Sequence, residues 1–151
     1  MKMKYRRILY ALGFIWVSPI TILAWILFCL PAWALGQTYR PRVDPYDLIF
    51  YWPFRERSWL CRFCDRKGWA GVTLGANIID AWLGMDGLDH EEAHVFQQYR
   101  WGCSFYLIYI LECIYLYVFT VKNPYADNHF ERAARKAAGQ ADPEMEDRIP
   151  W

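Results

Sequence analysis

The chain has 151 residues, of which 56% are hydrophobic and 19% aromatic, and its formal net charge is +1. This length suits one modest domain, or a membrane anchor with a smaller domain attached to it. The near-neutral charge argues against a nucleic-acid partner, and neither end of the chain resembles a nucleic-acid-binding arm. The aromatic content exceeds what a small soluble core needs, which favours a membrane-associated protein because Trp and Tyr prefer the membrane–water interface.

Residues 1–36 are predicted to form a single membrane anchor. The run from Ile8 to Leu35 contains no charged residue and exceeds the roughly 20 helical residues that cross a hydrocarbon core. Basic residues precede this run and favour a cytoplasmic N-terminus, although Arg40 and Arg42 on its far side weaken the asymmetry. A cleavable signal peptide and a re-entrant hairpin are the alternatives, but signal-peptide apolar cores usually have about 7–15 residues.

Residues 37–67 are predicted to be a linker or interfacial segment. Gln37–Asp47 contains two prolines and suits an extended linker, and the aromatic run Leu48–Phe54 is typical of an interfacial or edge element. Cys61 and Cys64 form a C-x-x-C pair, which can be half of a zinc knuckle or a redox dithiol. No second pair completes a knuckle, so incidental thiols, or a disulfide in an exported protein, are the simpler interpretation.

Residues 68–139 are predicted to form a compact zincin-like metal-binding domain, and an acidic tail follows at residues 140–151. Within the domain, Gly68–Asp80 is rich in small and β-branched residues and suits one or two strands. Leu83–Leu88 contains two glycines and is typical of a turn. Together with the helices expected on either side, this indicates an α+β fold that is mainly helical.

Two helices with recognisable ends are predicted in this domain. The first begins near Asp86 or Asp89 and ends at Gly102, a residue type common just past a helix C-terminus. The second begins at about Asn128, after an Asn-Pro break, and ends at Gly139.

A second apolar run, Ser104–Val121, lies between these helices and is interrupted only by Glu112, expected to be paired within a packed helix. Its length reaches about 27 Å, which is marginal for a membrane span. If the run crossed the membrane once, residues before and after it would face opposite sides and could not share a metal. The segment therefore lies along the interface, dips in and returns, or packs inside the domain, unless the ligand set below is wrong.

The pentapeptide His90-Glu91-Glu92-Ala93-His94 carries the strongest functional signal. The chain has only three histidines, and two of them lie four residues apart, where helical positions share one face. Both imidazoles can therefore bind one Zn²⁺, with Glu91 as general base toward a water, as in H-E-x-x-H metallopeptidases. The alternative is a pair of ordinary polar helix residues beside acids that favour a helix N-terminus.

A third protein ligand is needed, because catalytic zinc typically has three and leaves a fourth position to water. The motif that continues with a glycine and a third histidine is excluded, because Gln97 and Arg100 occupy those positions. Glu131 is the best remaining ligand and would complete a His₂Glu set. Asn128 and Glu131 also have the spacing of a capping box, so capping alone is the alternative role of Glu131.

Neighbouring side chains are candidates for supporting roles. Gln97 lies on nearly the same helix face as the first histidine and is predicted either to hydrogen-bond a ligand or to cap buried backbone. Asp127 and His129 are the fallback metal ligands. An oxyanion-stabilising group is expected, and Tyr125, Tyr99 and His129 are the candidates for it.

The stretches TLG, HEEAHVFQQYRWG and DNHFERAAR resemble a small bacterial family of uncharacterised predicted membrane proteins. The family pattern is TLG, HExxHxxQxxxxG, an apolar stretch and NPxxxNxFExxA, and the resemblance covers about Gly71–Lys136. The resemblance implies a bacterial inner-membrane location and a gluzincin-like set with two accompanying positions: His90, Glu91, His94 and Glu131, with Gln97 and Asn128. It implies no substrate, and the chain departs from the pattern at His129 and Ala133, where proline and an acidic residue are usual.

The sequence therefore predicts a membrane-associated, zinc-dependent hydrolase resembling a metallopeptidase. Its partners would be membrane lipid and a peptide or protein substrate near the membrane surface, without nucleic acid. The predicted roles are a catalytic base, three metal ligands and three accessory residues: Glu91; His90, His94 and Glu131; Gln97, Asn128 and His129. The alternative is a non-enzymatic membrane protein whose H-E-x-x-H helix is structural or only binds metal.

Overall fold

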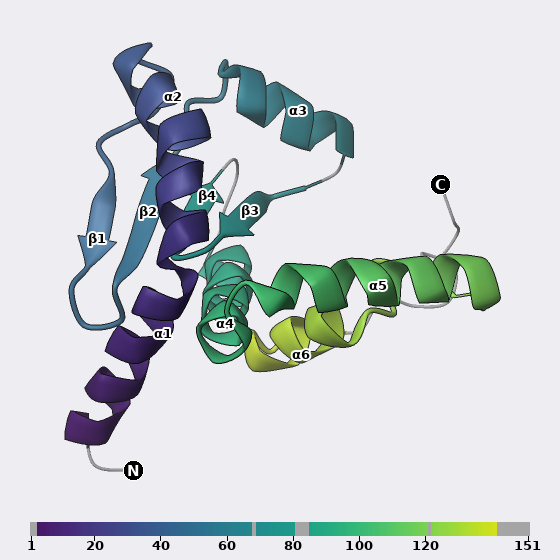
Figure 1. Ribbon diagram of the computed structural model, residues 1–151. Helices are drawn as coiled ribbons and strands as arrows, with labels where there is room; N and C mark the ends of the chain where they lie inside the picture. The colour runs from purple at the N-terminus through teal and green to yellow at the C-terminus, as the bar shows by residue number, and fades with distance from the viewer. Residues whose placement is uncertain (1–2, 68, 81–84, 121, 142–151) are drawn as a thin grey trace.

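The computed structural model describes residues 3–67, 69–80, 85–120 and 122–141. An N-terminal helical segment comprises α1 (Met3–Ala24), the π-helical turn η1 (Trp25–Cys29) and α2 (Leu30–Ala34) (Figure 1). The next elements are β1 (Arg42–Asp44), β2 (Ile49–Pro53), α3 (Trp59–Lys67), β3 (Gly71–Leu74) and β4 (Asn77–Asp80). Three helices follow: α4 (Met85–Trp101), α5 (Ser104–Phe119) and α6 (His129–Ala137). The prediction of a mainly helical α+β fold is confirmed.

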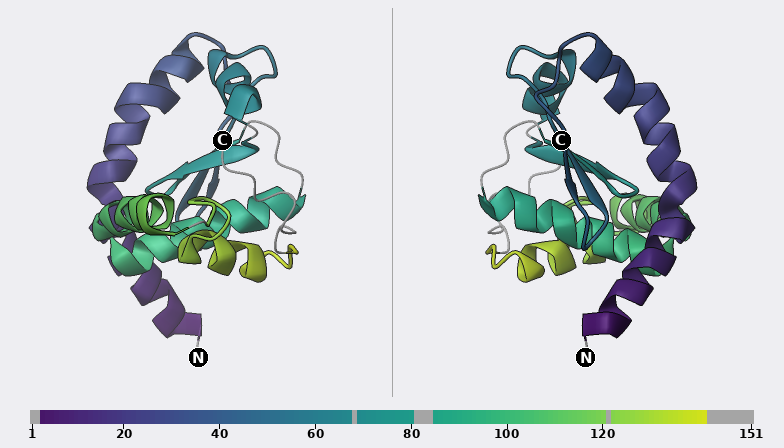
Figure 2. Two further views of the ribbon diagram at one scale, coloured as in Figure 1. Left: turned by 90° about the vertical axis from the view of Figure 1, so that its right-hand side faces the viewer. Right: turned by 90° about the vertical axis from the view of Figure 1, so that its left-hand side faces the viewer.

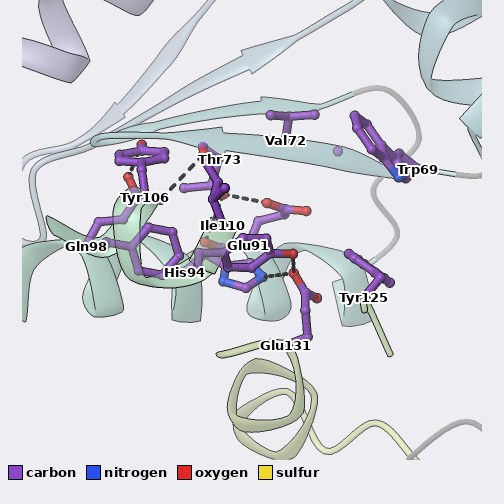
Figure 3. Close-up of a pocket in the computed structure, with 13 residues that line it drawn as sticks. Trp69, Val72, Thr73, Glu91, His94, Gln98, Tyr106, Ile110, Tyr125 and Glu131 are labelled. Carbon is purple, nitrogen blue, oxygen red and sulfur yellow. Dashed lines mark hydrogen bonds and ion pairs between the residues drawn. The ribbon is translucent and has the colours of Figure 1, made fainter. Parts of the chain in front are cut away.

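The four strands form one mixed sheet in the order β1-β2-β4-β3. The central strands β2 and β4 are parallel, and β1 and β3 pair antiparallel on the outside. Ile49 on β2 and Ile78 and Ile79 on β4 are buried, so the two central strands supply much of the core. β3 is an edge strand, and it lies directly above α4 (Figure 3).

The segment expected to be a linker contributes two of the four strands of the sheet. β1 arises within the proline-containing stretch, and β2 is an interior strand rather than an edge or interfacial element. The partner of β2 is β4, which begins 24 residues after β2 ends, at Asn77. Parallel pairing between segments this far apart leaves no local periodicity or turn signal, which explains why the sequence did not reveal it.

The C-x-x-C pair lies on α3, with Cys61 and Cys64 both fully buried. Positions three apart share a helix face, and these two side chains pack in one apolar cluster with Cys29, Trp52 and Leu60. None of the five cysteines, all within the described residues, forms a disulfide. The pair therefore serves core packing in this structure, in agreement with the simpler interpretation of these thiols.

The long N-terminal helix packs along one face of the sheet (Figures 1 and 2). Its segment from Arg7 to Ala34 is long and apolar enough to span a membrane. Its inner side is nevertheless tied to the sheet: Trp25 Nε1 donates to Asn77 Oδ1 at 2.5 Å, and Ala76 N donates to Thr21 Oγ1 at 3.0 Å. The predicted anchor is thus an integral element of the fold, and only its outer side is uncovered.

The helices α4 and α6 match their predicted ends closely. α4 ends at Trp101, and Gly102 follows with a φ of +59°, in the left-handed region that favours glycine. Its start at Met85 makes residues 85–88 helical, so that part of the predicted turn is wrong, and residues 81–84 lie outside the described residues.

The apolar helix α5 does not separate α4 from α6. α5 bends away from α4 by 111°, and α6 returns to pack against α4 (Figure 1). Glu112 accepts the backbone N–H of His129 at 2.9 Å and also contacts the ring of His129, so it is paired as expected. A single membrane crossing by Ser104–Val121 is incompatible with this arrangement, because the residues on its two sides meet.

Candidate metal centre

The histidines of the H-E-x-x-H sequence face each other on one side of α4. His90 and His94 lie one turn apart, and their Nε2 atoms are 3.1 Å from one another. Both residues are buried, with exposed fractions of 9% and 7%. Helix geometry alone brings them together, since positions i and i+4 share a face.

Glu131 on α6 completes the cluster. Its Oε2 atom is 3.3 Å from His90 Nε2, and its Oε1 atom is 3.3 Å from His94 Nε2. One ligand atom from each residue lies within 4.8 Å of the other two. Among the residues that the structure describes, this is the one group of histidine, cysteine and acidic side chains able to hold a metal ion.

Asn128 fixes the start of α6 and so places Glu131. Its Oδ1 atom accepts the backbone N–H of Phe130 at 2.9 Å, as an N-cap does, and its side chain is fully buried. The backbone N–H of Asn128 donates to the carbonyl of Tyr125 at 3.2 Å. The carboxylate of Glu131 points instead at the two histidines, in place of the capping-box contact that the spacing also allowed.

Side-chain amides fix how the two imidazoles are oriented. Gln97 Nε2 donates to the carbonyl of Phe130 at 2.9 Å, which leaves Gln97 Oε1 to accept from His94 Nδ1 at 2.9 Å. Gln140 Oε1 lies 3.1 Å from His90 Nδ1 in the same way. An amide oxygen can only accept, so each Nδ1 is the donor in these contacts and each Nε2 faces the cluster. Gln97 fulfils both of the roles that the sequence left open.

The donor atoms fit a divalent metal such as Zn²⁺. Two imidazole nitrogens bound tetrahedrally at about 2.0–2.1 Å from zinc would lie roughly 3.3 Å apart, close to the 3.1 Å between the Nε2 atoms. Glu131 Oε2 is buried without a hydrogen-bond partner, and it faces His90 Nε2. The two imidazole nitrogens and the carboxylate converge closely enough that they could hold a cation between them.

The charges within the cluster shift its pKa values in opposite directions. Burial raises the pKa of Glu131, but the adjacent His90 and His94 outweigh this effect and hold the pKa well below its usual range. Burial lowers the pKa of His94, but the hydrogen bond and charge of Glu131 prevail and raise it. Glu131 is therefore ionised at neutral pH, as a metal-binding carboxylate must be.

Glu91 lies beside the cluster, on the side of the edge strand. Thr73 Oγ1 on β3 donates to Glu91 Oε2 at 2.5 Å and so orients the carboxylate (Figure 3). Burial raises the pKa of Glu91, while His94, Thr73 and His90 lower it, and burial prevails. A carboxylate with a raised pKa is a better proton acceptor near neutral pH, which suits a general base.

A cavity of about 200 Å³ opens between β3, α4 and α5. Its lining combines polar site residues with a larger apolar and aromatic wall: Glu91, His94, Glu131, Thr73 and Gln98, with Trp69, Gly71, Val72, Phe105, Tyr106, Tyr109, Ile110 and Tyr125. In Figure 3, Glu91 and His94 rise from α4 below the edge strand, and Glu131 approaches from α6. The cluster is thus reachable from a pocket large enough for a side chain.

Two tyrosines flank Glu131. Tyr109 on α5 donates its hydroxyl to Glu131 Oε1 at 2.7 Å. Tyr125 lines the cavity, and burial followed by the charge and hydrogen bond of Glu131 raises its pKa. Tyr125 is therefore a protonated phenol at the edge of the pocket, in keeping with its place among the predicted oxyanion candidates.

Three other predicted candidates lie apart from the cluster. The ring of His129 contacts Glu112, and its side chain is 56% exposed. Asp127 Oδ2 accepts the backbone N–H of Asn123 at 3.0 Å. The hydroxyl of Tyr99 donates to backbone carbonyls before β2, so neither the fallback ligands nor Tyr99 reach the cavity.

The sequence did not single out Gln140, Thr73 or Tyr109. Gln140 follows α6, 50 residues from its partner His90, and was assigned to the acidic tail. Tyr109 was one aromatic residue among many in an apolar run. Only Thr73 had a signal, because it belongs to the TLG stretch that carries the family resemblance.

Comparisons of the chain with protein families, with curated proteins and with solved structures gave no match.

Proposed function

We propose that this protein is a membrane-associated, zinc-dependent hydrolase of the metallopeptidase type. The observation that carries the proposal is the convergence of His90, His94 and Glu131 at a pocket that Glu91 also lines. A metal site that serves structure alone has no use for a buried acid next to the ligands. Glu91 is such an acid, and a separate strand orients it.

The residues of the chain divide the chemistry between them. Bound by His90, His94 and Glu131, Zn²⁺ would lower the pKa of a water molecule and polarise a carbonyl group. Glu91 would act as general base toward a water in the pocket and would pass the proton to the leaving amine, a task that its raised pKa favours. Tyr125 can donate a hydrogen bond to the developing oxyanion from the rim of the cavity.

The edge strand β3 indicates the kind of substrate. It pairs with β4 on one side only, and Val72 and Thr73 border the cavity. An extended peptide can add to such an edge through main-chain hydrogen bonds and place one side chain in the pocket. The aromatic and aliphatic wall favours a large apolar side chain at that position.

The substitution Glu91→Gln tests the proposal. Wild-type protein loaded with zinc should cleave members of a mixed peptide library, read out by mass spectrometry. The variant should keep one equivalent of zinc and lose turnover by about 10²-fold or more, because the proton acceptor is gone. Equal cleavage by both proteins, or none by a zinc-loaded wild type, would instead favour the non-enzymatic alternative.

A further inference from the structure

Two uncovered apolar helix faces lie on the same side of the molecule. On α1 the exposed side chains include Leu12, Ile15 and Trp16, with exposed fractions of 59%, 66% and 62%. On α5 they include Ile114 and Val118, at 50% and 59%. Figure 2 shows both helices on one flank, with the sheet and α6 behind them. We call this surface, formed by the outer faces of α1 and α5, the apolar platform.

The packing of α1 against the sheet argues against α1 crossing a bilayer. Its inner face from Val17 to Ala32 is buried against the rest of the protein, so a perpendicular helix would carry the sheet into the hydrocarbon. The edge strands β1 and β3 would then leave backbone N–H and C=O groups unsatisfied, which hydrocarbon does not tolerate. Arg42 and Asp44 on β1 would be buried in lipid as well.

Charge at both ends of the helix complements an anionic membrane surface. The 43 residues before Asp44 contain six basic residues and no acidic one. Four basic residues precede the apolar run, and Arg40 and Arg42 follow it. Arg100 lies beside Leu12 and Trp16 on the surface of α1. A helix lying flat brings both basic ends to the same headgroup layer, whereas a crossing helix separates them.

We propose that the apolar platform docks in the plane of an anionic lipid leaflet and holds the protein on one side of the membrane without crossing it. Exposed Trp16 on α1 and Tyr115 on α5 suit the interfacial layer, where aromatic side chains with a polar edge are favoured. The helical segment from α1 through α2 is about 48 Å long, which exceeds the roughly 30 Å thickness of the hydrocarbon core of a bilayer. A helix that lies flat on the membrane does not have to match this thickness. This mode of docking does not depend on the metal centre.

Cysteine labelling of the two helix ends distinguishes docking from crossing. The full chain with the exposed Cys103 replaced by serine is the background, and by itself it is the control that should not be labelled. Arg7→Cys and Arg40→Cys are introduced separately into this background. A membrane-impermeant maleimide is added to spheroplasts and to inverted membrane vesicles. If the helix lies flat, both introduced cysteines should react in one preparation, either spheroplasts or inverted vesicles, and both should be protected in the other preparation. Labelling of the two ends from opposite sides, or a protein absent from the membranes, would overturn the proposal.

Vesicle flotation tests the surface itself. Wild-type protein should float with phosphatidylglycerol vesicles and more weakly with pure phosphatidylcholine vesicles. Ile114→Glu with Val118→Glu should weaken binding by more than about tenfold, because charges enter the lipid-facing side. Ala133→Glu with Ala137→Glu, at exposed positions of α6, adds the same charge and should bind as wild type. Equal binding by the two variants, or a platform occupied by a second copy of the chain in a stable dimer, would contradict the proposal.

Discussion

At the scale of single residues, the orientation of the imidazoles is what makes two helical histidines a candidate metal site. Gln97 ties His94 Nδ1 to the carbonyl of Phe130 on α6, so the ligand on one helix is oriented by the backbone of another. Such partners of the ligands fix the tautomer and typically change metal affinity by 10–100-fold. Gln97 is therefore a positioning residue for the site.

The substitution Gln97→Ala should weaken zinc affinity by about 10–100-fold, because His94 loses the acceptor that holds its ring. Competition with a chromophoric chelator measures the change. Glu92→Gln is the control on the same helix: Glu92 accepts the hydroxyl of Tyr51 away from the cluster, so zinc affinity should stay at the wild-type value. An unchanged affinity in Gln97→Ala would show that the amide does not support the ligand.

At the scale of elements, the sequence revealed what depends on local signals. The β3 and β4 strands were expected within Gly68–Asp80, and α4 and α6 end near the glycines that predicted their ends. The pair His90 and His94 followed from helix periodicity alone. Spacing made Glu131 the first choice for the third ligand but did not decide its role. The spacing of Asn128 and Glu131 also fits a capping box, in which Glu131 would bind no metal.

What the sequence missed depends on contacts between distant segments. The interior strand β2 needs β4 for its pairing, and Gln140 meets His90 only because α6 folds back on α4. Neither hydrophobic periodicity nor turn residues in the sequence indicate such long-range contacts. The predicted anchor was likewise recognised by composition, while the packing of its inner face against the sheet was not visible.

The junction between α4 and α5 provides an element-scale prediction. A Cβ on Gly102 would lie 1.5 Å from Trp16 Nε1, whereas one on Gly139 would meet nothing within 4 Å. Both glycines have positive φ, so alanine costs roughly 1 kcal/mol of backbone strain at either position. Gly102→Ala should therefore lower the thermal unfolding midpoint clearly more than Gly139→Ala, as measured in mild detergent. Similar midpoints would mean that α1 does not pack on this junction.

At the scale of the whole molecule, the metal would join parts of the chain that are far apart. His90 and His94 belong to α4, and Glu131 belongs to α6 beyond the apolar α5. A ligand that binds only the folded state stabilises it by about 2.7 kcal/mol at one hundred times its dissociation constant. Zinc bound at this site should therefore stabilise the tertiary structure in addition to its proposed role in catalysis.

Removal of the metal should therefore lower the unfolding midpoint of the wild type. EDTA should shift the midpoint downward, and added zinc should restore it, because the three ligands are brought together only in the folded state, which zinc would therefore bind preferentially. Glu131→Ala is the matched control and should respond to neither addition. An EDTA shift of equal size in Glu131→Ala would place the stabilising metal elsewhere.

The proposed chemistry depends on one metal centre, so the most direct measurement is the zinc content per chain of purified wild type, His94→Ala and Glu131→Ala. We predict one equivalent in the wild type and none in either variant, with all three proteins folded by circular dichroism. A folded wild type without metal would contradict the hydrolase proposal. Zinc retained by Glu131→Ala but lost from His94→Ala would contradict the ligand set, because the third ligand would then lie outside α6.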